Sequence, residues 1–267
     1  MTVASKAARI LIIAGSDSSG GAGIQAGIKT ASAFGAYAMT AITAVTVQNT
    51  KGVHAIHAVP PSIIREQILT ALSDIGADAI VIGMLFSAPI VRMVAETLAS
   101  LVRAVPIVVD PVMVSTSGTM LLDSHAVETL KKRLLPLAAL VTPNIPEMHR
   151  LAQVKGSRRE DIRFAAGKLR AMGAGAVLVK GGHLTKSTID DVLIWEKGEE
   201  IFAFPRIKTR HTHGTGCTLA TAIACGLGQG LSLPLAVGRA REYVQRAIAA
   251  APGFGHGRGP LGHAVKP

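Results

Sequence analysis

The residues best suited to chemistry lie in the stretch 206–226, where two glycines precede a run of Ala, Leu, Thr and Ile. Gly214 and Gly216 have no Cβ, so the backbone can take unusual dihedral angles there and approach a ligand closely. The run from about 215 to 226 predicts a helix. Its unpaired N–H groups and positive dipole end would point back at the turn, a geometry that binds anions.

Cys217 lies in the first turn of this predicted helix, where the dipole favours a thiolate and is expected to lower the thiol pKa. Together with Thr215 and the two glycines, it predicts an anion-binding turn with an activated base or nucleophile. The alternative is a glycine-rich turn before a buried helix, with Cys217 as a small core residue.

Three charged residues at predicted strand or helix ends point to phosphate chemistry. Lys180 ends a strand before two glycines, where it can reach a nucleotide phosphate. Asp110 ends another strand, and Glu147 begins a helix; such oxygen ligands suit Mg²⁺, directly or through water. The alternatives are a solvated lysine, an aspartate that caps a turn and a first-turn helix acid.

Other site types have less support. The segment 21–26 matches the dinucleotide pattern G-x-G-x-x-A, but six residues separate it from the strand and 39–47 holds no acid. The nucleotide-binding pattern G-x-x-x-x-G-K-[ST] and the hydrolase pattern G-x-S-x-G are absent. His211, His213 and Cys217 lack a second ligand pair at recognised spacing, which disfavours zinc.

Composition limits the class of protein. The 267 residues are 49% hydrophobic and 3% aromatic, which fits helices packed on a buried parallel sheet. The net charge of +11 favours anionic partners, but the basic residues are scattered, so small phosphorylated molecules fit better than nucleic acid. Cys217 and Cys225 are too far apart along one helix for a disulfide. Two cysteines that cannot pair lead us to expect a reduced, cytoplasmic protein. No apolar run is long enough for a membrane span.

Strand and helix patterns alternate along the chain. Strands are predicted at 10–14, 37–47, 52–59, 78–82, 107–109, 140–142, 176–179, 191–196 and 200–204, the last two as a hairpin. Helices are predicted at 22–34, 62–75, 88–102, 124–134, 157–172, 215–226 and 233–250, the last capped by Ser232. This alternation predicts one α/β domain over 1–267, a three-layer α/β/α fold with a mostly parallel central sheet. The tail from 251 to 267 is rich in Gly, His and Pro and is expected to be loose or draped over the surface.

Ligands of such folds bind at the carboxyl ends of the strands. Seven polar or glycine-containing stretches fall there: 15–23, 48–49, Met84, 110–113, 144–147, 180–183 and 211–217. Their convergence on one rim predicts the site better than any single motif.

Taken in order, these motifs carry a resemblance. They read Gly15-Ser-Asp-Ser-Ser-Gly-Gly-Ala-Gly-Ile-Gln25, Gln48-Asn-Thr50, Ile82-Gly-Met84, Asp110-Pro-Val-Met113, Thr142-Pro-Asn-Ile-Pro-Glu147, Lys180-Gly-Gly-His183 and His211-Thr-His-Gly-Thr-Gly-Cys217. From about Ile10 to Ala250 the chain resembles the hydroxymethylpyrimidine/phosphomethylpyrimidine kinases of thiamin biosynthesis, in the ribokinase-like superfamily. The resemblance implies two ATP-dependent phosphorylations, of the alcohol and then of its monophosphate, at one site.

The resemblance also implies roles for individual residues. Gln48 would hydrogen-bond the pyrimidine, and Gly15 and Met84 would help to form its pocket. Lys180 and Thr212 would contact ATP, Asn144 and Glu147 would lie in the Mg-ATP network, and 214–217 would form the anion hole. The expected partners are the pyrimidine and ATP, with no nucleic acid or membrane, and a homo-oligomer is expected, with a dimer favoured.

A Cys217 thiolate would accept the hydroxyl proton in the first step, whereas the nucleophile of the second step is already an anion. Two residues depart from the family pattern. Ser18 replaces a common proline, and Gly27 replaces an aspartate that contacts the pyrimidine. The alternatives are a kinase for pyridoxal or another small alcohol, and a non-catalytic ligand-binding protein.

Overall fold

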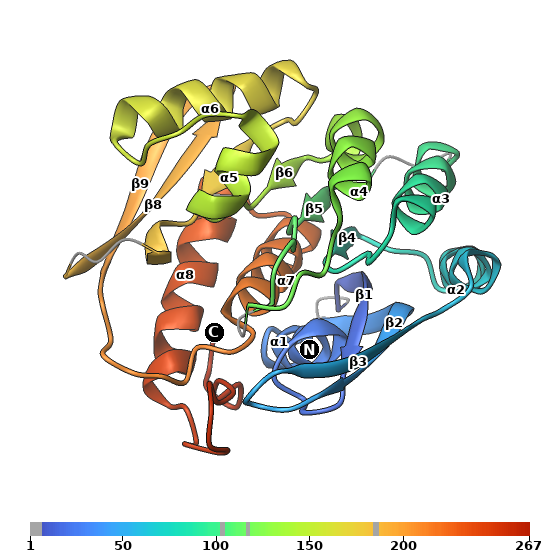
Figure 1. Ribbon diagram of the computed structural model, residues 1–267, viewed down its shortest axis with the longest axis horizontal. Helices are drawn as coiled ribbons and strands as arrows, with labels where there is room; N and C mark the ends of the chain where they lie inside the picture. The colour runs from blue at the N-terminus through green and yellow to red at the C-terminus, as the bar shows by residue number, and fades with distance from the viewer. Residues whose placement is uncertain (1–6, 102–104, 116–117, 184–186) are drawn as a thin grey trace, which may run out of the picture.

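The structure is a computed structural model that describes residues 7–101, 105–115, 118–183 and 187–267 (Figure 1). Its strands form one nine-stranded sheet in the order β3-β2-β1-β4-β5-β6-β7-β8-β9. They are β1 (Arg9–Asp17), β2 (Tyr37–Gln48), β3 (Val53–Ala58), β4 (Ala79–Ile82), β5 (Ile107–Val109), β6 (Leu140–Val141), β7 (Val177–Val179), β8 (Thr188–Trp195) and β9 (Gly198–Pro205). The pairs from β2 to β7 are parallel, while β3, β8 and β9 run antiparallel to their neighbours.

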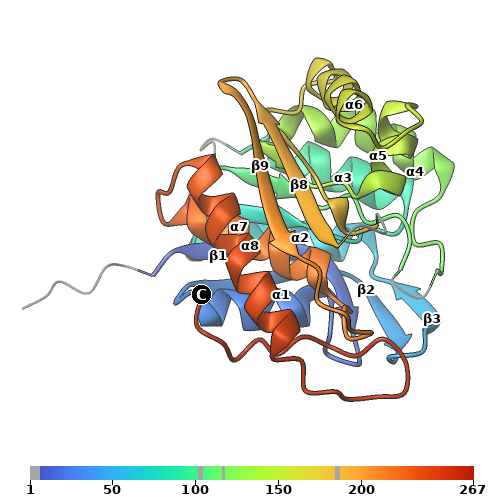
Figure 2. The same cartoon turned by 90° about the vertical axis from the view of Figure 1, so that its left-hand side faces the viewer.

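Helices cover both faces of this sheet. One face carries α1 (Gly23–Ala33), α7 (Thr215–Gly228) and α8 (Leu233–Ala249), which lie together in Figure 2. The other carries α2 (Pro61–Asp74), α3 (Ala88–Ala99), α4 (Ser124–Thr129), α5 (Ile145–Ala152) and α6 (Arg159–Ala171). The predicted three-layer fold with a mostly parallel sheet is therefore confirmed.

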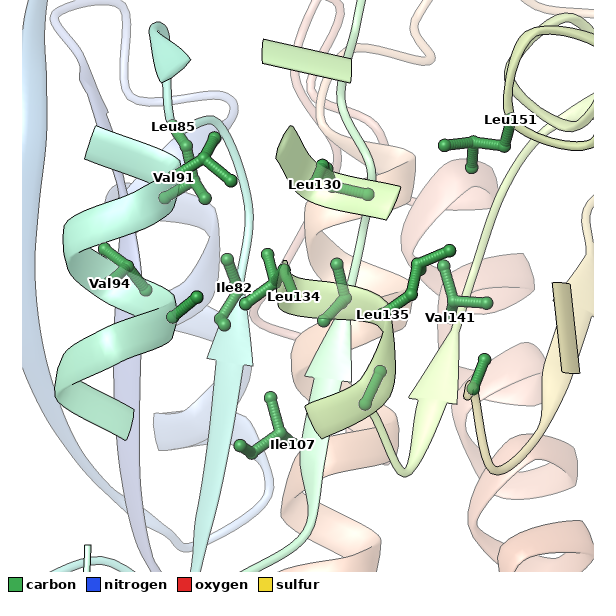
Figure 3. Packing of buried hydrophobic residues seen from close by; sticks show 14 of the residues in the cluster. Ile82, Leu85, Val91, Val94, Ile107, Leu130, Leu134, Leu135, Val141 and Leu151 are labelled. Carbon is green, nitrogen blue, oxygen red and sulfur yellow. The ribbon is translucent and has the colours of Figure 1, made fainter. Parts of the chain in front are cut away.

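The buried strands explain the near-continuous apolar runs in the sequence. Along β1, Ile10 and Ile12 pack towards α1, α7 and α8, whereas Leu11 and Ile13 pack towards α2 and α3. Side chains alternate between the faces of a strand, and a sheet covered on both sides needs apolar residues at every position. Figure 3 shows the core between the sheet and the helices α2 to α6, where Ile82 of β4 and Val141 of β6 are buried.

Three predicted helices differ in detail. The helix predicted at 124–134 is α-helical only to Thr129 and continues as a π-helical turn, η1 (Leu130–Leu134), and a 3₁₀ turn, η2 (Leu135–Leu137). Pro136 cannot donate the next helical hydrogen bond, so the chain turns there. Ser232 occupies the N-cap position of α8 but makes no side-chain capping bond. The helix predicted at 88–102 corresponds to α3, which ends at Ala99. Residue 102, the predicted end, lies outside the described residues.

The tail is draped over the surface, one of the two possibilities that its composition leaves open. Figure 2 follows this segment, in red, from the end of α8 along the side of the molecule that carries α1. Leu261 and His263 are buried. The Tyr243 hydroxyl donates to the His263 carbonyl at 2.9 Å, and Gly262 N–H donates to the Ala247 carbonyl at 2.9 Å. The segment has no helix or strand pattern, but these contacts with α8 hold it in place. We name residues 257–263 the C-terminal strap.

None of the described helices combines the length and apolar character that crossing a membrane requires.

Candidate active site

A cavity of about 880 Å³ opens at the carboxyl ends of the parallel strands. All seven stretches singled out in the sequence contribute to its wall, through Gly15, Gln48, Met84, Asp110, Asn144, Glu147, Lys180, Thr212, Gly214, Thr215, Gly216 and Cys217 among others. The predicted convergence is confirmed. It follows from the topology, because parallel strands end at the same edge of the sheet.

The N-terminus of α7 faces this cavity. Its N-cap is Gly214, which has a φ of +84° and lies against the backbone carbonyl of Gly21, so a side chain has no room there. Among the described residues, no side chain caps this helix. The N–H groups of Gly216 and Cys217 in its first turn therefore remain available to an anion, as the sequence predicts.

Gly216 brings the helix N-terminus against two charged groups. A Cβ at this position would lie 2.8 Å from Asp110 Oδ2 and 3.4 Å from Lys180 Nζ. Only a glycine leaves these side chains undisturbed. The turn before α7, the end of β5 and the end of β7 thus meet at one point, although more than 100 residues separate Asp110 from Gly216 in the sequence.

Lys180 is the cation that faces both Asp110 and Glu147. Its Nζ lies 2.6 Å from Asp110 Oδ1 and 4.0 Å from Glu147 Oε2, and its side chain is 15% exposed. Burial lowers the pKa of Lys180, but the charges of Asp110 and Glu147 outweigh burial, so the pKa is raised and the ammonium is retained. Lys180 is therefore not a solvated surface lysine.

Glu147 fits both of its sequence interpretations. It forms a capping box with Asn144: Glu147 N–H donates to Asn144 Oδ1 at 2.9 Å, and Asn144 N–H donates to Glu147 Oε2 at 2.8 Å. It is also 6% exposed and faces Lys180. Burial and the charge of Asp110 outweigh the opposing charge of Lys180, and raise the Glu147 pKa to about 7.

The two carboxylates of Asp110 and Glu147 fit Mg²⁺ as part of its coordination. In the described part of the chain, no group of three or more His, Cys, Asp or Glu side chains is arranged to hold a metal ion. Mg²⁺ binds through one or two carboxylates, with water and phosphate oxygens completing the octahedron. The chemistry of this pair matches that pattern.

The predicted thiolate at Cys217 is wrong for this structure. Burial, followed by the negative charge of Asp110, raises the Cys217 pKa to about 12. Lys180 opposes this rise without cancelling it. A helix N-terminus stabilises a thiolate by at most about 1–2 kcal/mol, so a desolvated thiol near a carboxylate stays protonated. Cys217 and Cys225 are both free thiols, as expected.

Asp17 organises the first glycine-rich loop, a role that the sequence did not reveal. Its carboxylate accepts hydrogen bonds from Ser19 N–H (2.8 Å), Ser19 Oγ (2.7 Å), Gly21 N–H (3.0 Å) and Ala22 N–H (2.8 Å). His213 Nε2 lies 2.8 Å from Asp17 Oδ2. Burial raises the Asp17 pKa, but the bonds from His213 and Ser19 outweigh it and lower the pKa to about 2. This bond ties the first loop to the turn before α7.

The predicted substrate residues lie near this pair. Gln48 Oε1 accepts from Thr46 Oγ1 at 3.1 Å, and its Nε2 lies 3.4 Å from His213 Nε2. Asp17 is ionised, so His213 Nε2 carries the proton that bonds it and offers Gln48 no lone pair. The amide N–H groups of Gln48 are therefore available to a ligand. Nearby, Met84 is buried, and its Sδ would lie 3.3 Å from a Cβ on Gly15.

Position 27 lies away from the cavity wall. Gly27 is buried on α1 and does not line the cavity. A Cβ there would lie 2.8 Å from Ile12 Cδ1 and 3.4 Å from Thr221 Oγ1. The residue packs α1 between β1 and α7, so it offers no contact to a pyrimidine in the cavity. Sequence spacing placed it in the right helix but did not give the direction in which it points.

A second buried pair, also missed from the sequence, supports Lys180 from behind. Arg241 Nε lies 2.9 Å from Asp191 Oδ2, and both residues are less than 10% exposed. Asp191 Oδ1 accepts from Gly181 N–H at 2.8 Å. Since Gly181 follows Lys180 directly, this bond fixes the turn that carries the lysine. Asp190 is the preceding residue on β8, and the sequence alone does not show which of the two acids forms the pair with Arg241.

Thr212 and Thr215 lie in the turn before α7 as expected, and both line the cavity. The Thr212 N–H donates to the Arg210 carbonyl at 3.1 Å, and Thr215 N–H donates to the Thr212 carbonyl at 3.4 Å. These backbone bonds shape the turn before α7.

The chain is similar to proteins of known name. A sequence model of the phosphomethylpyrimidine kinase family matches residues 17–262. The hydroxymethylpyrimidine/phosphomethylpyrimidine kinase of Streptomyces coelicolor is 47% identical over 255 residues, which cover 95% of this chain and 93% of that protein. The thiamine biosynthesis bifunctional protein of Geobacter sulfurreducens is 48% identical over 254 residues, 95% of this chain and 52% of that protein. The chain thus spans about half the length of that bifunctional relative.

The fold has solved counterparts. The crystal structure of an ADP complex of Bacillus subtilis pyridoxal kinase matches with a TM-score of 0.88 at 34% identity, and the match covers 97% of this chain and 98% of that one.

Proposed function

The chain belongs to the phosphomethylpyrimidine kinase family, and on that premise we propose that it phosphorylates 4-amino-5-hydroxymethyl-2-methylpyrimidine with ATP in thiamin biosynthesis. The first product is the monophosphate and the second is the diphosphate, and one domain over 1–267 performs both steps. The Streptomyces coelicolor relative, at 47% identity, is named for both kinase activities, whereas the pyridoxal kinase structure is 34% identical. This difference favours the pyrimidine over pyridoxal as the substrate.

The observation that carries the proposal is the meeting of Lys180, Asp110 and the α7 N-terminus at Gly216. Phosphoryl transfer needs in-line positioning and neutralisation of charge on the transferred group more than it needs covalent chemistry. An ammonium group and a row of free N–H groups, held within one buried corner, supply that neutralisation.

The acceptor is proposed to bind at the other end of the cavity. There the Gln48 amide can hydrogen-bond the pyrimidine, while Met84 and Gly15 form the apolar wall beside it. The Asp17–His213 bond fixes the loops on both sides. The hydroxymethyl group would then face Cys217, at the junction of the two ends.

Cys217 is proposed as the base of the first step. Its thiol must lose a proton before it can accept the one on the acceptor hydroxyl, and its pKa of about 12 makes this costly at neutral pH. In the second step the nucleophile is a phosphate oxygen that is already ionised, so no base is required. The two steps thus make different demands on the same residue.

ATP and Mg²⁺ are the proposed cofactors, and they supply the phosphoryl group and the charge that balances it. Asp110 and Glu147 would hold Mg²⁺, directly or through water, with Asn144 ordering Glu147 through the capping box. Lys180 would contact the ATP phosphates, and Thr212 the nucleotide beside them. ADP in the solved pyridoxal kinase relative supports a nucleotide site on this fold.

The proposal is tested by a coupled assay of ADP release with the pyrimidine alcohol, its monophosphate and pyridoxal as acceptors. We expect turnover with the first two at kcat/KM values well above that for pyridoxal. Turnover with pyridoxal alone would overturn the substrate assignment, and ATP binding without turnover of any acceptor would overturn the kinase assignment.

A homo-oligomer, with a dimer favoured, and a cytoplasmic location are further parts of the proposal. Val45 and Val47 on β2 are about half exposed beside the edge strand β3, which supports a contact surface on that side. Sedimentation equilibrium at micromolar concentration tests the oligomer, and a monomer mass would contradict it.

A further inference from the structure

The C-terminal strap lies against the acceptor end of the cavity. The Arg258 N–H donates to the Thr50 carbonyl at 2.8 Å, and Gly257 N–H donates to Thr50 Oγ1 at 3.1 Å. Thr50 comes two residues after Gln48, the proposed contact of the pyrimidine. The strap is therefore bound to the strand end that presents this residue.

The other side of the strap is bound to the turn before α7. The His213 N–H donates to the Gly259 carbonyl at 3.1 Å, and Pro260 pairs with His213 in a parallel bridge. Farther along, His263 Nε2 lies 2.9 Å from Thr218 Oγ1, one residue beyond Cys217. Residue 258 is thus held between the two loops that carry Gln48 and Cys217.

Arg258 is the charged residue that this anchoring delivers to the cavity wall. Two other cations of the wall are held in ion pairs, Lys180 with Asp110 and Arg241 with Asp191. Arg150, Arg206, Lys208 and Arg210 also line the wall, but they lie outside the strap. In the part of the chain that the structure describes, no carboxylate or other acceptor holds the Arg258 guanidinium. The strap backbone is fixed, while its positive charge is left free beside the acceptor end.

The charge at this end is otherwise settled. Asp17 is the nearest buried acid in the first loop, and His213, Ser19 and two backbone N–H groups already satisfy its carboxylate. An additional guanidinium is therefore not needed to balance the protein itself. An arginine with an unpaired guanidinium at the cavity wall is suited to an anionic ligand, and its planar donors match phosphate oxygens.

We propose that Arg258 binds the phosphate of the phosphorylated acceptor and so adapts the site to its second substrate. The inference rests on the proposed function, because only that reaction sequence presents an alcohol and then a phosphate monoester to one pocket. The alcohol carries no group for Arg258, whereas the monophosphate carries a dianion that must be oriented towards the transferred phosphoryl group. Arg258 is thus a specificity residue for the second step.

The test compares steady-state kinetics of the wild type, Arg258→Ala and Arg258→Lys with each acceptor varied at saturating Mg-ATP. For Arg258→Ala we expect KM for the monophosphate to rise roughly 10-fold, the low end for a charge-assisted hydrogen bond because the side chain is exposed. KM for the alcohol should stay within about 2-fold, because the strap's backbone bonds are retained. Arg258→Lys should recover part of the loss.

Lys51→Ala is the matched control. Lys51 is an exposed cation that directly follows Thr50 and lies outside the cavity wall. Its removal changes the net charge by the same amount as the removal of Arg258. Equal KM changes for both acceptors in Arg258→Ala, or no change for either, would overturn the proposal. Wild-type protein that turned over neither acceptor would instead overturn the proposed function, so the two failures are distinguishable.

Discussion

The two ends of the cavity handle negative charge in opposite ways. At the acceptor end, Asp17 is surrounded by donors from its own loop and from His213, and its pKa falls to about 2. At the opposite end, which we call the phosphate end, Asp110 and Glu147 both face Lys180, and the Glu147 pKa rises to about 7. Apart from Arg258, the acceptor end is electrostatically complete before a ligand binds, whereas the other end has an excess of carboxylate.

This difference separates shape from chemistry. The acceptor end consists of short bonds between the first loop, the turn before α7 and the C-terminal strap, so it is expected to hold its geometry without a ligand. The phosphate end is suited to an incoming cation, since desolvated like charges favour a group that neutralises them. Variants at the phosphate end should therefore affect turnover, and variants at the acceptor end should affect stability.

The largest effect is expected at Cys217, where the two ends meet. If it is the base, Cys217→Ala should slow the first phosphorylation by roughly 10²–10⁴-fold, the usual contribution of general base catalysis. The second phosphorylation should change much less. Rapid-quench measurement of each step, with the alcohol or the monophosphate as the starting acceptor, gives both numbers. Equal losses would make Cys217 a structural part of the anion hole.

The pH profile sharpens this prediction. A thiol with a pKa of about 12 is protonated throughout the working range, so its thiolate fraction rises about tenfold for each pH unit. The first-step rate of the wild type should therefore keep rising from pH 7 to 9. The rise should be absent in Cys217→Ala and in the second step. A flat wild-type profile would exclude the thiolate as the base.

Lys180→Ala is expected to have the next largest effect. Both steps use the same ATP phosphates, so kcat/KM should fall roughly 10–150-fold in each, which corresponds to one charge-assisted contact. The variant also leaves Asp110 and Glu147 facing each other without a cation. Lys197→Ala, in the exposed β8–β9 turn, is the control for loss of a charge. Unchanged kinetics with both acceptors would place Lys180 outside the reaction.

His263→Gln tests the strap that supports the acceptor end. Burial lowers the pKa of His263 to about 4 from 6.5, so its neutral form stabilises the fold above pH 6.5 and that stability is lost as pH falls through about 4. The loss amounts to about 3 kcal/mol. Glutamine does not titrate, so the advantage of the wild type in unfolding free energy should shrink by this amount between pH 7 and 4. A constant difference in urea denaturation would refute the assignment.

Asp17→Asn is expected to have the smallest effect, and at lower pH. The Asp17 pKa is lowered from 3.8 to about 2, so its stabilisation is present above pH 3.8 and is lost as pH falls through about 2. This contribution is about 2 kcal/mol. Urea denaturation from pH 5 to 2.5 should show the wild type and the variant converging. Parallel curves would mean that the loop does not depend on the Asp17 charge.

The sequence predicted the fold well because its signals are local. Apolar runs such as that at 10–14 locate the buried strands, although β1 continues past Gly15 to Asp17, and parallel strands of a sheet end at one edge. The polar residues that follow those strands therefore had to share a rim. Lys180, Asp110 and Gly216 could be named from this rule alone, and the structure brings them into contact.

Direction and environment were less accessible. Gly27 was placed in the correct helix, but which way it points depends on how α1 packs between β1 and α7. The Gly, His and Pro content of the tail predicts a loose or draped segment without choosing between the two, and only the backbone bonds to Thr50 and Ala247 show that it is held in place. Asp17 resembled any polar residue in a glycine-rich loop until His213 approached it.

The amino-acid sequence by itself thus determined the order of the elements, the edge at which they present polar groups and the kind of ligand those groups suit. The tertiary structure alone decided the protonation state of those groups. The Cys217 pKa depends on burial and on the Asp110 carboxylate, which enters from another strand more than 100 residues away. Helix position is a local property, whereas desolvation and charge sum over every group that folding brings near, and this sum reversed the expected shift of the pKa.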